Sequence, residues 1–154
     1  MNIIKTTDHE IIARLNKDVH QIYSKLYPEY FKEYNFDEIS NFFKEIIHKP
    51  RFTFLVLEND NTQVGYAWVE IMEYKENVFK KSYKSVWVHQ ICVLSTERGK
   101  GYGSKLMEKV YEIAKENHIS KIELEYWSDN INAKEFYLHR GFVKYREFVY
   151  KEIS

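Results

Sequence analysis

The sequence predicts an α/β fold in which a mixed central sheet carries helices on both faces. Two observations support this class. Strand-like segments cluster before a glycine-rich turn at Glu97–Gly103, and beyond that turn helical and strand patterns alternate. A cluster of strands followed by alternating elements is the pattern of a mixed sheet that is covered on both sides.

Length, charge and cysteine content limit the class of protein. A chain of 154 residues can bury a core as one domain, residues 1–154. Lys plus Arg equals Asp plus Glu, at 23 each, so no net charge attracts nucleic acid or an anionic membrane. The lone Cys92 excludes an intramolecular disulfide and a cysteine metal cluster, and we expect it to be a small core residue. With neither a signal peptide nor a bilayer-spanning apolar run, the expected location is the cytoplasm.

The N-terminal third is expected to contain one short strand and two helices. Asn2–Lys5 has the character of a strand. The capping-box pattern Thr7-x-x-Glu10 opens a helix to about Leu26, in which apolar residues recur at helical spacing. This first helix therefore turns one face to the core. A second helix is expected at Asp37–Lys49.

Three strands are expected in the middle of the chain. Phe52–Leu57 and Val64–Met72 flank a polar turn cluster, Glu58–Gln63, and form a hairpin. The next connection, Glu73–Ser85, is long and rich in lysine, as a flexible loop near a binding site often is. The apolar, β-branched run Val86–Val93 is typical of a strand that is buried on both faces.

Helices and strands alternate in the last third. A helix begins at Ser104, just after the glycines, and ends near Asn117. Lys121–Trp127 is expected to form the fifth strand, Asn132–Arg140 a short helix, and Phe142–Ile153 closing strand structure.

The glycine-rich turn has the composition of a phosphate-binding loop. Gly99, Gly101 and Gly103 allow backbone angles that are closed to other residues and leave no side chains in front of the N–H groups. The helix that follows adds unpaired N–H donors and the positive end of its dipole. Arg98 and Lys100 supply full positive charges, so the turn is suited to hold a phosphate.

Spacing decides which phosphate loop this is. A Walker A loop needs G-x-x-x-x-G-K-[ST], but Lys100 precedes the last two glycines and no acidic residue is placed to hold magnesium. A dinucleotide-binding loop needs G-x-G-x-x-G within an early βαβ unit, which this chain lacks. Both nucleotide-binding classes are therefore disfavoured.

Two segments resemble the GNAT superfamily of N-acetyltransferases. Arg98–Gly103, RGKGYG, resembles the [RQ]-x-x-G-x-[GA] signature that clasps the pyrophosphate of acetyl-coenzyme A in that family. Asn130–Phe142, NINAKEFYLHRGF, resembles the downstream block N-x-A-x-x-F-Y-x-x-x-G-F. The two matches occur in the family's order, separated by one helix and one strand. The resemblance covers Val64–Glu152 well and the first sixty residues only by the order of elements.

The resemblance implies a mostly antiparallel sheet and transfer of an acetyl group from acetyl-coenzyme A to a primary amine. The partners that it implies are the cosubstrate and an amine acceptor, with neither nucleic acid nor membrane, and it leaves a homodimer open. In the family, pantetheine lies where the fourth and fifth strands part, like an added strand. The residues that correspond to cosubstrate contacts are Ile91, Cys92, Val93, Arg98, Gly99, Lys100, Gly101, Tyr102, Gly103, Ser104, Asn132, Ala133, Phe136 and Tyr137.

Three residues are the catalytic candidates. The resemblance assigns protonation of the leaving thiolate to Tyr137, whose ordinary pKa is about 10, near that of a thiol. His89 stands where many members of the family carry a Glu, and a neutral imidazole can accept the amine proton directly or through water. Glu70, within an apolar strand, is the alternative base. A reaction in which neither acts and the amine arrives neutral stays open.

The acceptor is the part that the sequence defines least. The 27–36 and 73–85 segments and the closing strands are expected to form the mouth through which the acceptor enters. Aromatic residues and carboxylates occur together in these two segments and predict a small cationic amine, since both attract a cation. The alternatives are a protein or peptide amine, a neutral amino compound, or a domain that binds acyl-coenzyme A without turning it over. The histidines lack metal-ligand spacing, so no metal site is expected. Lys134, His139 and Arg140 flank the short helix and are expected to form a solvated face, with contact to the adenosine 3'-phosphate of the cosubstrate as the alternative.

Overall fold

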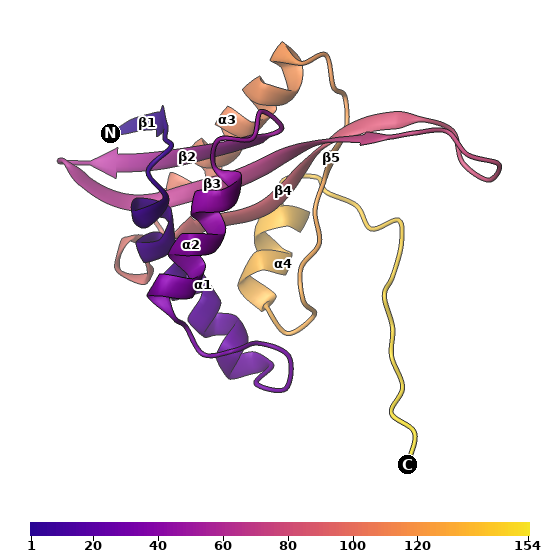
Figure 1. The fold of residues 1–154 in the computed structure, drawn as a ribbon, viewed down its shortest axis with the longest axis horizontal. Coiled ribbons are helices and arrows are strands. Elements are labelled where there is room, and N and C mark those ends of the chain that lie inside the picture. The colour runs from indigo at the N-terminus through magenta and orange to yellow at the C-terminus, as the bar shows by residue number, and fades with distance from the viewer.

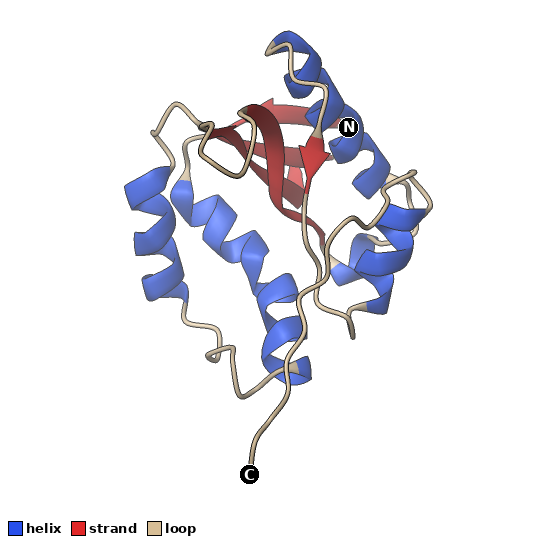
Figure 2. Ribbon diagram, turned by 90° about the vertical axis from the view of Figure 1, so that its right-hand side faces the viewer, coloured by secondary structure: helices blue, strands red, loops and turns tan.

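A computed structural model describes all residues, 1–154, and shows one five-stranded sheet between two layers of helices (Figures 1 and 2). The strands are arranged in the order β1-β2-β3-β4-β5. Their bounds are Asn2–Lys5 for β1, Phe52–Asn59 for β2, Thr62–Tyr74 for β3, Tyr83–Val93 for β4 and Ile122–Glu123 for β5. Neighbours pair antiparallel except β4 and β5, which are parallel. The predicted class, a mixed and mostly antiparallel sheet with helices on both faces, is confirmed.

Each face of the sheet has its own hydrophobic core. Helices α1 (His9–Leu26) and α2 (Phe36–Ile46) cover one face, where Phe43 packs edge to face against Phe54 of β2 and against Trp68 of β3. Helix α3 (Tyr102–Glu116) covers the other face, where Leu106 and Val110 are fully buried. Helix α4 (Ile131–Leu138) packs beside this second core through Phe136. None of the four helices is both long and apolar enough to cross a bilayer.

The start of α1 differs from the predicted capping box. The N-cap is Asp8, whose carboxylate accepts from the backbone N–H groups of Glu10 and Ile11 at 3.0 and 3.2 Å. Thr6, not Thr7, adds a hydroxyl that accepts from the N–H of Asp8 at 3.0 Å. The prediction was wrong by one position because Asp is an equally good N-cap and its reach fixes the first turn.

The loop predicted at Glu73–Ser85 is shorter in the structure, because strands extend into it from both ends. Strands β3 and β4 continue to Tyr74 and from Tyr83, whose rings stack with centroids 4.5 Å apart. Only residues 75–82 lie outside the strands, and the long hairpin projects from the body at the right of Figure 1. The stacked pair of tyrosines across the two strands stabilises the hairpin. The lysines of the hairpin are consistent with its exposure to solvent. The earlier hairpin turns at Asp60 and Asn61, both with positive φ.

An extra residue in β4 disturbs its pairing with β3. Val69 pairs with Val88 and Trp68 with Gln90, so His89 has no partner in the ladder. Such a bulge lets consecutive side chains face the same side of the sheet. The His89 ring stacks on Trp68 at 4.3 Å, and the Gln90 carbonyl accepts from the Asn16 amide of α1 at 3.0 Å. Both therefore face the layer of α1 and α2.

The two predicted C-terminal strands are shorter or missing. Of the fifth strand predicted at Lys121–Trp127, only Ile122–Glu123 pairs, with Val86 and Trp87 of β4. The closing strand predicted at Phe142–Ile153 does not form. Residues 143–154 have no regular structure and extend away from the body as the yellow segment of Figure 1. A strand-like sequence forms a strand only where another strand offers a partner.

Candidate active site

A cleft of about 500 Å³ lies between α1, the end of β4, the start of α3, and α4. Segments that are far apart in the sequence meet there. The lining residues are Val19, Ile22, Ile91, Cys92, Val93, Glu97, Arg98, Gly99, Gly101, Tyr102, Gly103, Ser104, Asn130, Asn132, Ala133, Phe136, Tyr137 and Arg140. The structure thus brings together every residue that the sequence predicted for cosubstrate contacts except Lys100.

One end of the cleft is the N-terminus of α3. Gly101 caps the helix in the left-handed conformation, with φ of 81°, and offers no side-chain hydrogen bond. The N–H groups of Tyr102, Gly103 and Ser104 therefore have no acceptor inside the helix, and they face the same region as the positive end of its dipole. A side chain at Gly103 would lie 2.9 Å from Phe136, so the glycine also allows α4 to approach this end.

The basic residues of the turn play different parts. Arg98 lines the cleft, where its Nε donates to the Val93 carbonyl at 3.3 Å. The Lys100 ammonium instead donates to the Glu97 carboxylate at 2.5 Å, and that hydrogen bond raises the pKa of Lys100. Arg98 is therefore the guanidinium aimed at the cleft, whereas Lys100 forms an exposed ion pair beside it.

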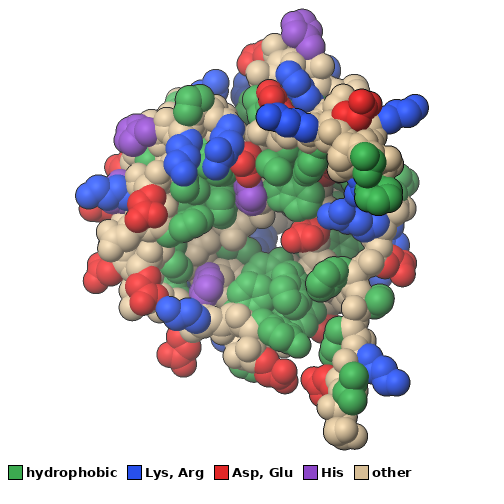
Figure 3. All heavy atoms as spheres, turned by 45° about the vertical axis from the view of Figure 1, so that its right-hand side comes forward, with side chains coloured by type: hydrophobic (Ala, Val, Ile, Leu, Met, Phe, Trp, Pro, Cys, Tyr) green, Lys and Arg blue, Asp and Glu red, His purple; other side chains and the backbone are tan.

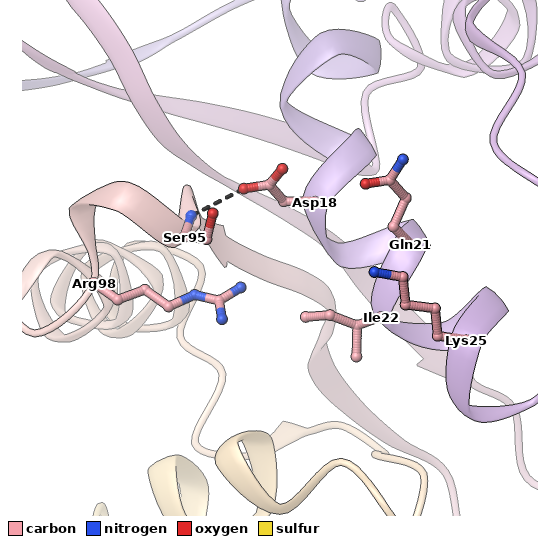
Figure 4. A pocket seen from close by; sticks show the side chains of 6 residues that line it. All are labelled: Asp18, Gln21, Ile22, Lys25, Ser95 and Arg98. Atoms are coloured by element: carbon pink, nitrogen blue, oxygen red, sulfur yellow. Dashed lines mark hydrogen bonds between the residues drawn. The ribbon is translucent and has the colours of Figure 1, made fainter.

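A smaller hollow of about 170 Å³ adjoins the cleft and shares Arg98 and Ile22 with it (Figure 4). Across from Arg98, the Asp18 carboxylate of α1 accepts from the backbone N–H of Ser95 at 2.9 Å. This bond fixes the turn that follows β4 against α1. Lys25 adds a second cation to the wall of the hollow.

Arg140 was predicted to lie on a solvated face, but it lies in the wall of the cleft. Its guanidinium sits 3.6 Å from the centroid of the Phe136 ring and donates to the Phe136 carbonyl at 2.8 Å. It also donates to the Ser104 hydroxyl. Arg140 thus ties the end of α4 to the first turn of α3 and places a second positive charge near the free N–H groups.

The middle of the cleft follows an edge of β4 that has no neighbouring strand. Strand β5 pairs with β4 only at Val86 and Trp87, whereas β3 accompanies β4 to Val93. Beyond Trp87, the backbone groups of β4 that face β5 lack a strand partner. They are available to an extended ligand, as the sequence predicted for a strand with partners on one side.

Tyr137 of α4 is another residue of the cleft lining. Its side chain is 8% exposed, and its ring meets Phe136 and Phe142 edge to face at 5.1 and 5.6 Å. Burial raises the pKa of Tyr137 well above its ordinary value, and the nearby Tyr23 acts in the same direction. The hydroxyl therefore keeps its proton at neutral pH.

Cys92 is a core residue that also borders the cleft. The thiol is 4% exposed and points at the Leu15 carbonyl of α1, 3.7 Å away. Burial raises the pKa of Cys92 to about 12, with the Asp18 carboxylate adding to the effect. The thiolate needed for nucleophilic attack is therefore scarce at neutral pH, and the thiol has a packing role.

The two candidate bases, His89 and Glu70, are hydrogen-bonded partners. The His89 Nε2 lies 2.9 Å from Glu70 Oε1, and the other carboxylate oxygen forms an ion pair with Arg51, whose Nε is 2.8 Å away. Glu70 is only 13% exposed, so it is not a solvated edge residue, while His89 is 27% exposed. Neither lines the cleft. His89 is two residues from Ile91, roughly 7 Å along an extended strand.

An aromatic cluster joins the end of α1 to the segment before α4. The Trp127 ring has its centroid 4.6 Å from Tyr27, 5.1 Å from Phe31 and 5.8 Å from Tyr30. The Tyr27 hydroxyl donates to the Asp129 carboxylate at 2.8 Å. Trp127 is 39% exposed and Tyr30 is 60% exposed, so aromatic surface remains open to solvent here.

The second aromatic segment predicted for the acceptor mouth lies elsewhere. Tyr74, Tyr83 and Glu73 belong to the projecting hairpin of β3 and β4, where Glu73 pairs with Lys84 at 3.5 Å. Figure 1 shows this hairpin pointing away from the loop between α1 and α2. The expectation that both segments form one mouth was therefore wrong, and the 27–36 segment meets Trp127 instead.

Several residues of this region were not found from the sequence. Asn130 caps α4 by accepting from the Ala133 N–H at 3.3 Å, and it donates to the Tyr23 hydroxyl at 3.0 Å. Its place as an N-cap before a helix was a readable signal. Buried Asn16 donates to the Tyr66 hydroxyl at 3.0 Å and to Gln90. A polar residue on the apolar face of a predicted helix was the signal for this network.

Comparison with known proteins agrees with this geometry. Residues 16–142 match the model of the acetyltransferase (GNAT) family. An uncharacterized N-acetyltransferase of Archaeoglobus fulgidus is 30% identical over 137 residues, which cover 82% of this chain and 88% of that protein. Streptothricin acetyltransferase A of Bacillus subtilis is 32% identical over 111 residues, or 65% of this chain and 63% of that protein.

The fold is shared with solved structures. A fourfold mutant of a Bacillus halodurans protein, solved by X-ray crystallography, superposes with a TM-score of 0.91 at 23% identity. The superposition covers 99% of this chain and 100% of that one. The chain belongs to the acetyltransferase (GNAT) family, and it is an acetyl-CoA-dependent N-acetyltransferase.

Proposed function

We propose that the chain binds acetyl-CoA in the cleft and transfers the acetyl group directly to a primary amine of a small cationic acceptor. The observation that carries this proposal is the continuity of the cleft. It joins the free N–H groups of the α3 N-terminus to the Tyr137 hydroxyl along the unpaired edge of β4. Phosphates suit the first part, and an extended amide-containing chain suits the edge.

The residues present fit acetyl-CoA, which when bound supplies an activated acetyl group as a thioester. The N–H groups of Tyr102, Gly103 and Ser104 hold the pyrophosphate, with Arg98 and Arg140 adding positive charge. Backbone N–H groups near Ile91–Val93 bind and polarise oxygen atoms at the free edge of β4. Ile91, Phe136 and Tyr137 add apolar surface to the lining.

Tyr137 donates the proton that the leaving thiolate requires. The raised pKa of the phenol would make it a poor acid toward a thiolate in water. The sulfur, however, would gain its charge beside this buried phenol, and burial would destabilise the thiolate in the same way that it destabilises the phenolate. The two groups therefore stay matched, and transfer occurs as charge develops on sulfur.

His89 receives the amine proton through water, and Glu70 positions it. A direct contact with an amine in the cleft is not available, because His89 lies outside the lining. Glu70 accepts a hydrogen bond from His89 Nε2 and forms an ion pair with Arg51. The proton of the imidazole therefore stays on Nε2, and Nδ1 can accept a proton.

The acceptor approaches beside the aromatic cluster. The exposed surfaces of Trp127 and Tyr30 attract a cation through their ring quadrupoles, and Glu29 and Glu33 are exposed carboxylates of the same loop. Figure 3 shows that one face of the molecule is hollowed, with hydrophobic side chains around the hollow and charged ones near its rim. The name of the Bacillus subtilis relative, which identifies streptothricin as its substrate, favours a small acceptor.

The substitution Gly101→Asp tests the phosphate site. A carboxylate at the cap should repel the pyrophosphate and weaken coenzyme A binding by roughly tenfold or more, which corresponds to about 1.4 kcal/mol. Calorimetric titration measures it. Gly141→Asp is the matched control, because Gly141 also has positive φ, 85°, and open space around it, but lies after α4. Equal affinity in Gly101→Asp and the unaltered chain would place the phosphates elsewhere.

Tyr137→Phe tests the general acid. Loss of the hydroxyl should lower kcat by roughly ten- to a hundredfold or more and leave coenzyme A affinity nearly unchanged. Steady-state thiol release gives kcat, and calorimetry gives the affinity. Tyr126→Phe is the control, since the Tyr126 hydroxyl is buried without a partner and its ring lies 6.3 Å from that of Tyr137. Weakened binding with unchanged kcat would make Tyr137 a binding residue only.

His89→Gln and Glu70→Gln together test the base. Removal of the imidazole should abolish the acidic limb of the pH profile of kcat/KM, because that limb reports protonation of the base. Glu70→Gln should lower kcat/KM and keep an acidic limb, since the imidazole remains. Glu73→Gln, on the same strand, is the control. If His89→Gln retains the limb of the unaltered enzyme, the amine proton does not pass through His89.

Trp127→Ala tests the acceptor class. A panel of polyamines, aminoglycosides, amino acids and short peptides is compared by thiol release. Cationic small amines should give the highest kcat/KM, and Trp127→Ala should raise their KM by roughly fivefold or more through loss of the cation–π attraction. Phe79→Ala is the control, because Phe79 is an aromatic residue, 91% exposed, on the distant hairpin. Preference for neutral amines or peptides would exclude a small cationic acceptor.

A further inference from the structure

A buried polar network joins α1 to β3 and β4. The Asn16 side chain of α1 is 4% exposed, and its Nδ2 donates to the Tyr66 hydroxyl and to Gln90 Oε1, each at 3.0 Å. Tyr66 of β3 is fully buried, and its hydroxyl donates to the same Gln90 oxygen. Burial raises the pKa of Tyr66 well above its ordinary value, so the hydroxyl keeps the proton that it donates. Buried polar groups are costly without their hydrogen bonds, so this network fixes the groups that it joins.

The bulge in β4 changes the face to which the residues of the strand point. Before the bulge, Val86 and Val88 are buried in the core that α3 covers. After it, Cys92 is buried in the core of α1 and α2, and Gln90 faces α1. In a regular strand, residues two apart share a face, so these four residues would all point the same way. The extra residue, His89, therefore lets β4 supply side chains to both cores.

The network depends on the bulge, and it holds the bulge in place. A regular strand that kept Val88 in the core of α3 would turn the Gln90 amide into that apolar core. The Asn16 amide and the Tyr66 hydroxyl would then be buried on the other face without their shared acceptor. Each group left without a partner would bear its full desolvation penalty. Because Gln90 directly follows the extra residue, the network acts on the bulge itself.

The side chain of the extra residue lies on the same face as the network. The His89 ring stacks on Trp68 at 4.3 Å, and its Nε2 lies 2.9 Å from Glu70. Trp68 is the strand partner of Gln90, so the ring that supports His89 stands opposite the residue that Asn16 holds. Bulges beside active sites direct a side chain in this way.

We propose that Asn16 and Tyr66 are positioning residues, which hold Gln90 and thereby keep the bulge at His89 with its ring directed at Glu70. Neither Asn16 nor Tyr66 lines the cleft, so neither is expected to contact the cosubstrate. Their effect passes through the backbone of β4. The kinetic part of this proposal rests on the proposed function, in which His89 receives the amine proton.

Histidine NMR of the full chain tests the position of the ring. The indole of Trp68 should displace the His89 Cε1–H signal through its ring current, and His89→Gln identifies that signal by its absence. Asn16→Leu removes the donors at similar size, and Tyr66→Phe removes only the hydroxyl. In both variants the His89 signal should move toward that of the exposed His48. A His89 signal that stays in place in both variants overturns the proposal.

Ser40→Ala is the matched control for both measurements. Ser40 is 6% exposed, lies on α2 in the same helical layer, and has its hydrogen bond with His9 of α1 at 2.9 Å, so the network is not involved. This variant should keep the His89 signal and kcat of the unaltered chain. Circular dichroism and Tm verify that each variant is folded. A shift of the His89 signal in Ser40→Ala equal to that in Asn16→Leu would mean that any loss of packing moves the ring, and it overturns the proposal.

Kinetics show whether the position of His89 matters for the reaction. Asn16→Leu should lower kcat by roughly tenfold and leave coenzyme A affinity unchanged by calorimetry, because a displaced base loses part of its contribution. In a His89→Gln background, Asn16→Leu should add little further loss, since the residue that it positions is gone. A full additional loss in that background overturns the proposal. If the NMR signal moves and kcat does not, the network directs His89 as proposed, and it is the role of His89 in proton transfer that fails.

Discussion

The site depends on the early parting of β4 from β5. The two strands pair at Val86 and Trp87 and then separate, while β3 stays paired with β4 as far as Val93. A strand edge inside a protein is normally satisfied by another strand, so its backbone groups are costly to leave without a partner. Here they face a cleft and not a neighbour. The fold therefore leaves backbone N–H and C=O groups of β4 free to bind a ligand next to the glycine-rich turn.

The contacts around the cleft hold its walls at a fixed spacing. Asp18 ties α1 to the turn after β4, Arg140 ties α4 to α3, and Tyr27 ties the end of α1 to Asp129. Each tie joins segments distant in sequence, and each uses a charged or polar side chain at the border of the cleft. Gly103 allows α4 to lie close to α3, because Phe136 leaves no room for a side chain at position 103.

Sequence patterns predicted the elements that carry their own signal. The polar cluster Glu58–Gln63 between two apolar segments located β2 and β3, the glycines at 99, 101 and 103 located the start of α3, and the Asn130–Phe142 block located α4. It was harder to predict which strands pair with each other. The sequence of residues 143–154 is strand-like, but a strand forms only with a partner, which the pattern does not name. The contact between His89 and Glu70 was likewise hidden, because it depends on the register of β3 against β4.

The bulge in β4 has a consequence for how this sheet can change. The pairs on either side of the bulge, Val69 with Val88 and Trp68 with Gln90, form a regular ladder that does not include His89. His89 is thus a bulge residue without a partner in β3, and its side chain faces α1 and α2 while Gln90 keeps its own pairing. The ladder makes no demand on the chemistry of position 89. The side chain at position 89 is constrained by its contacts with Trp68 and Glu70, so a substitution there changes those contacts while the pairing of the sheet stays the same.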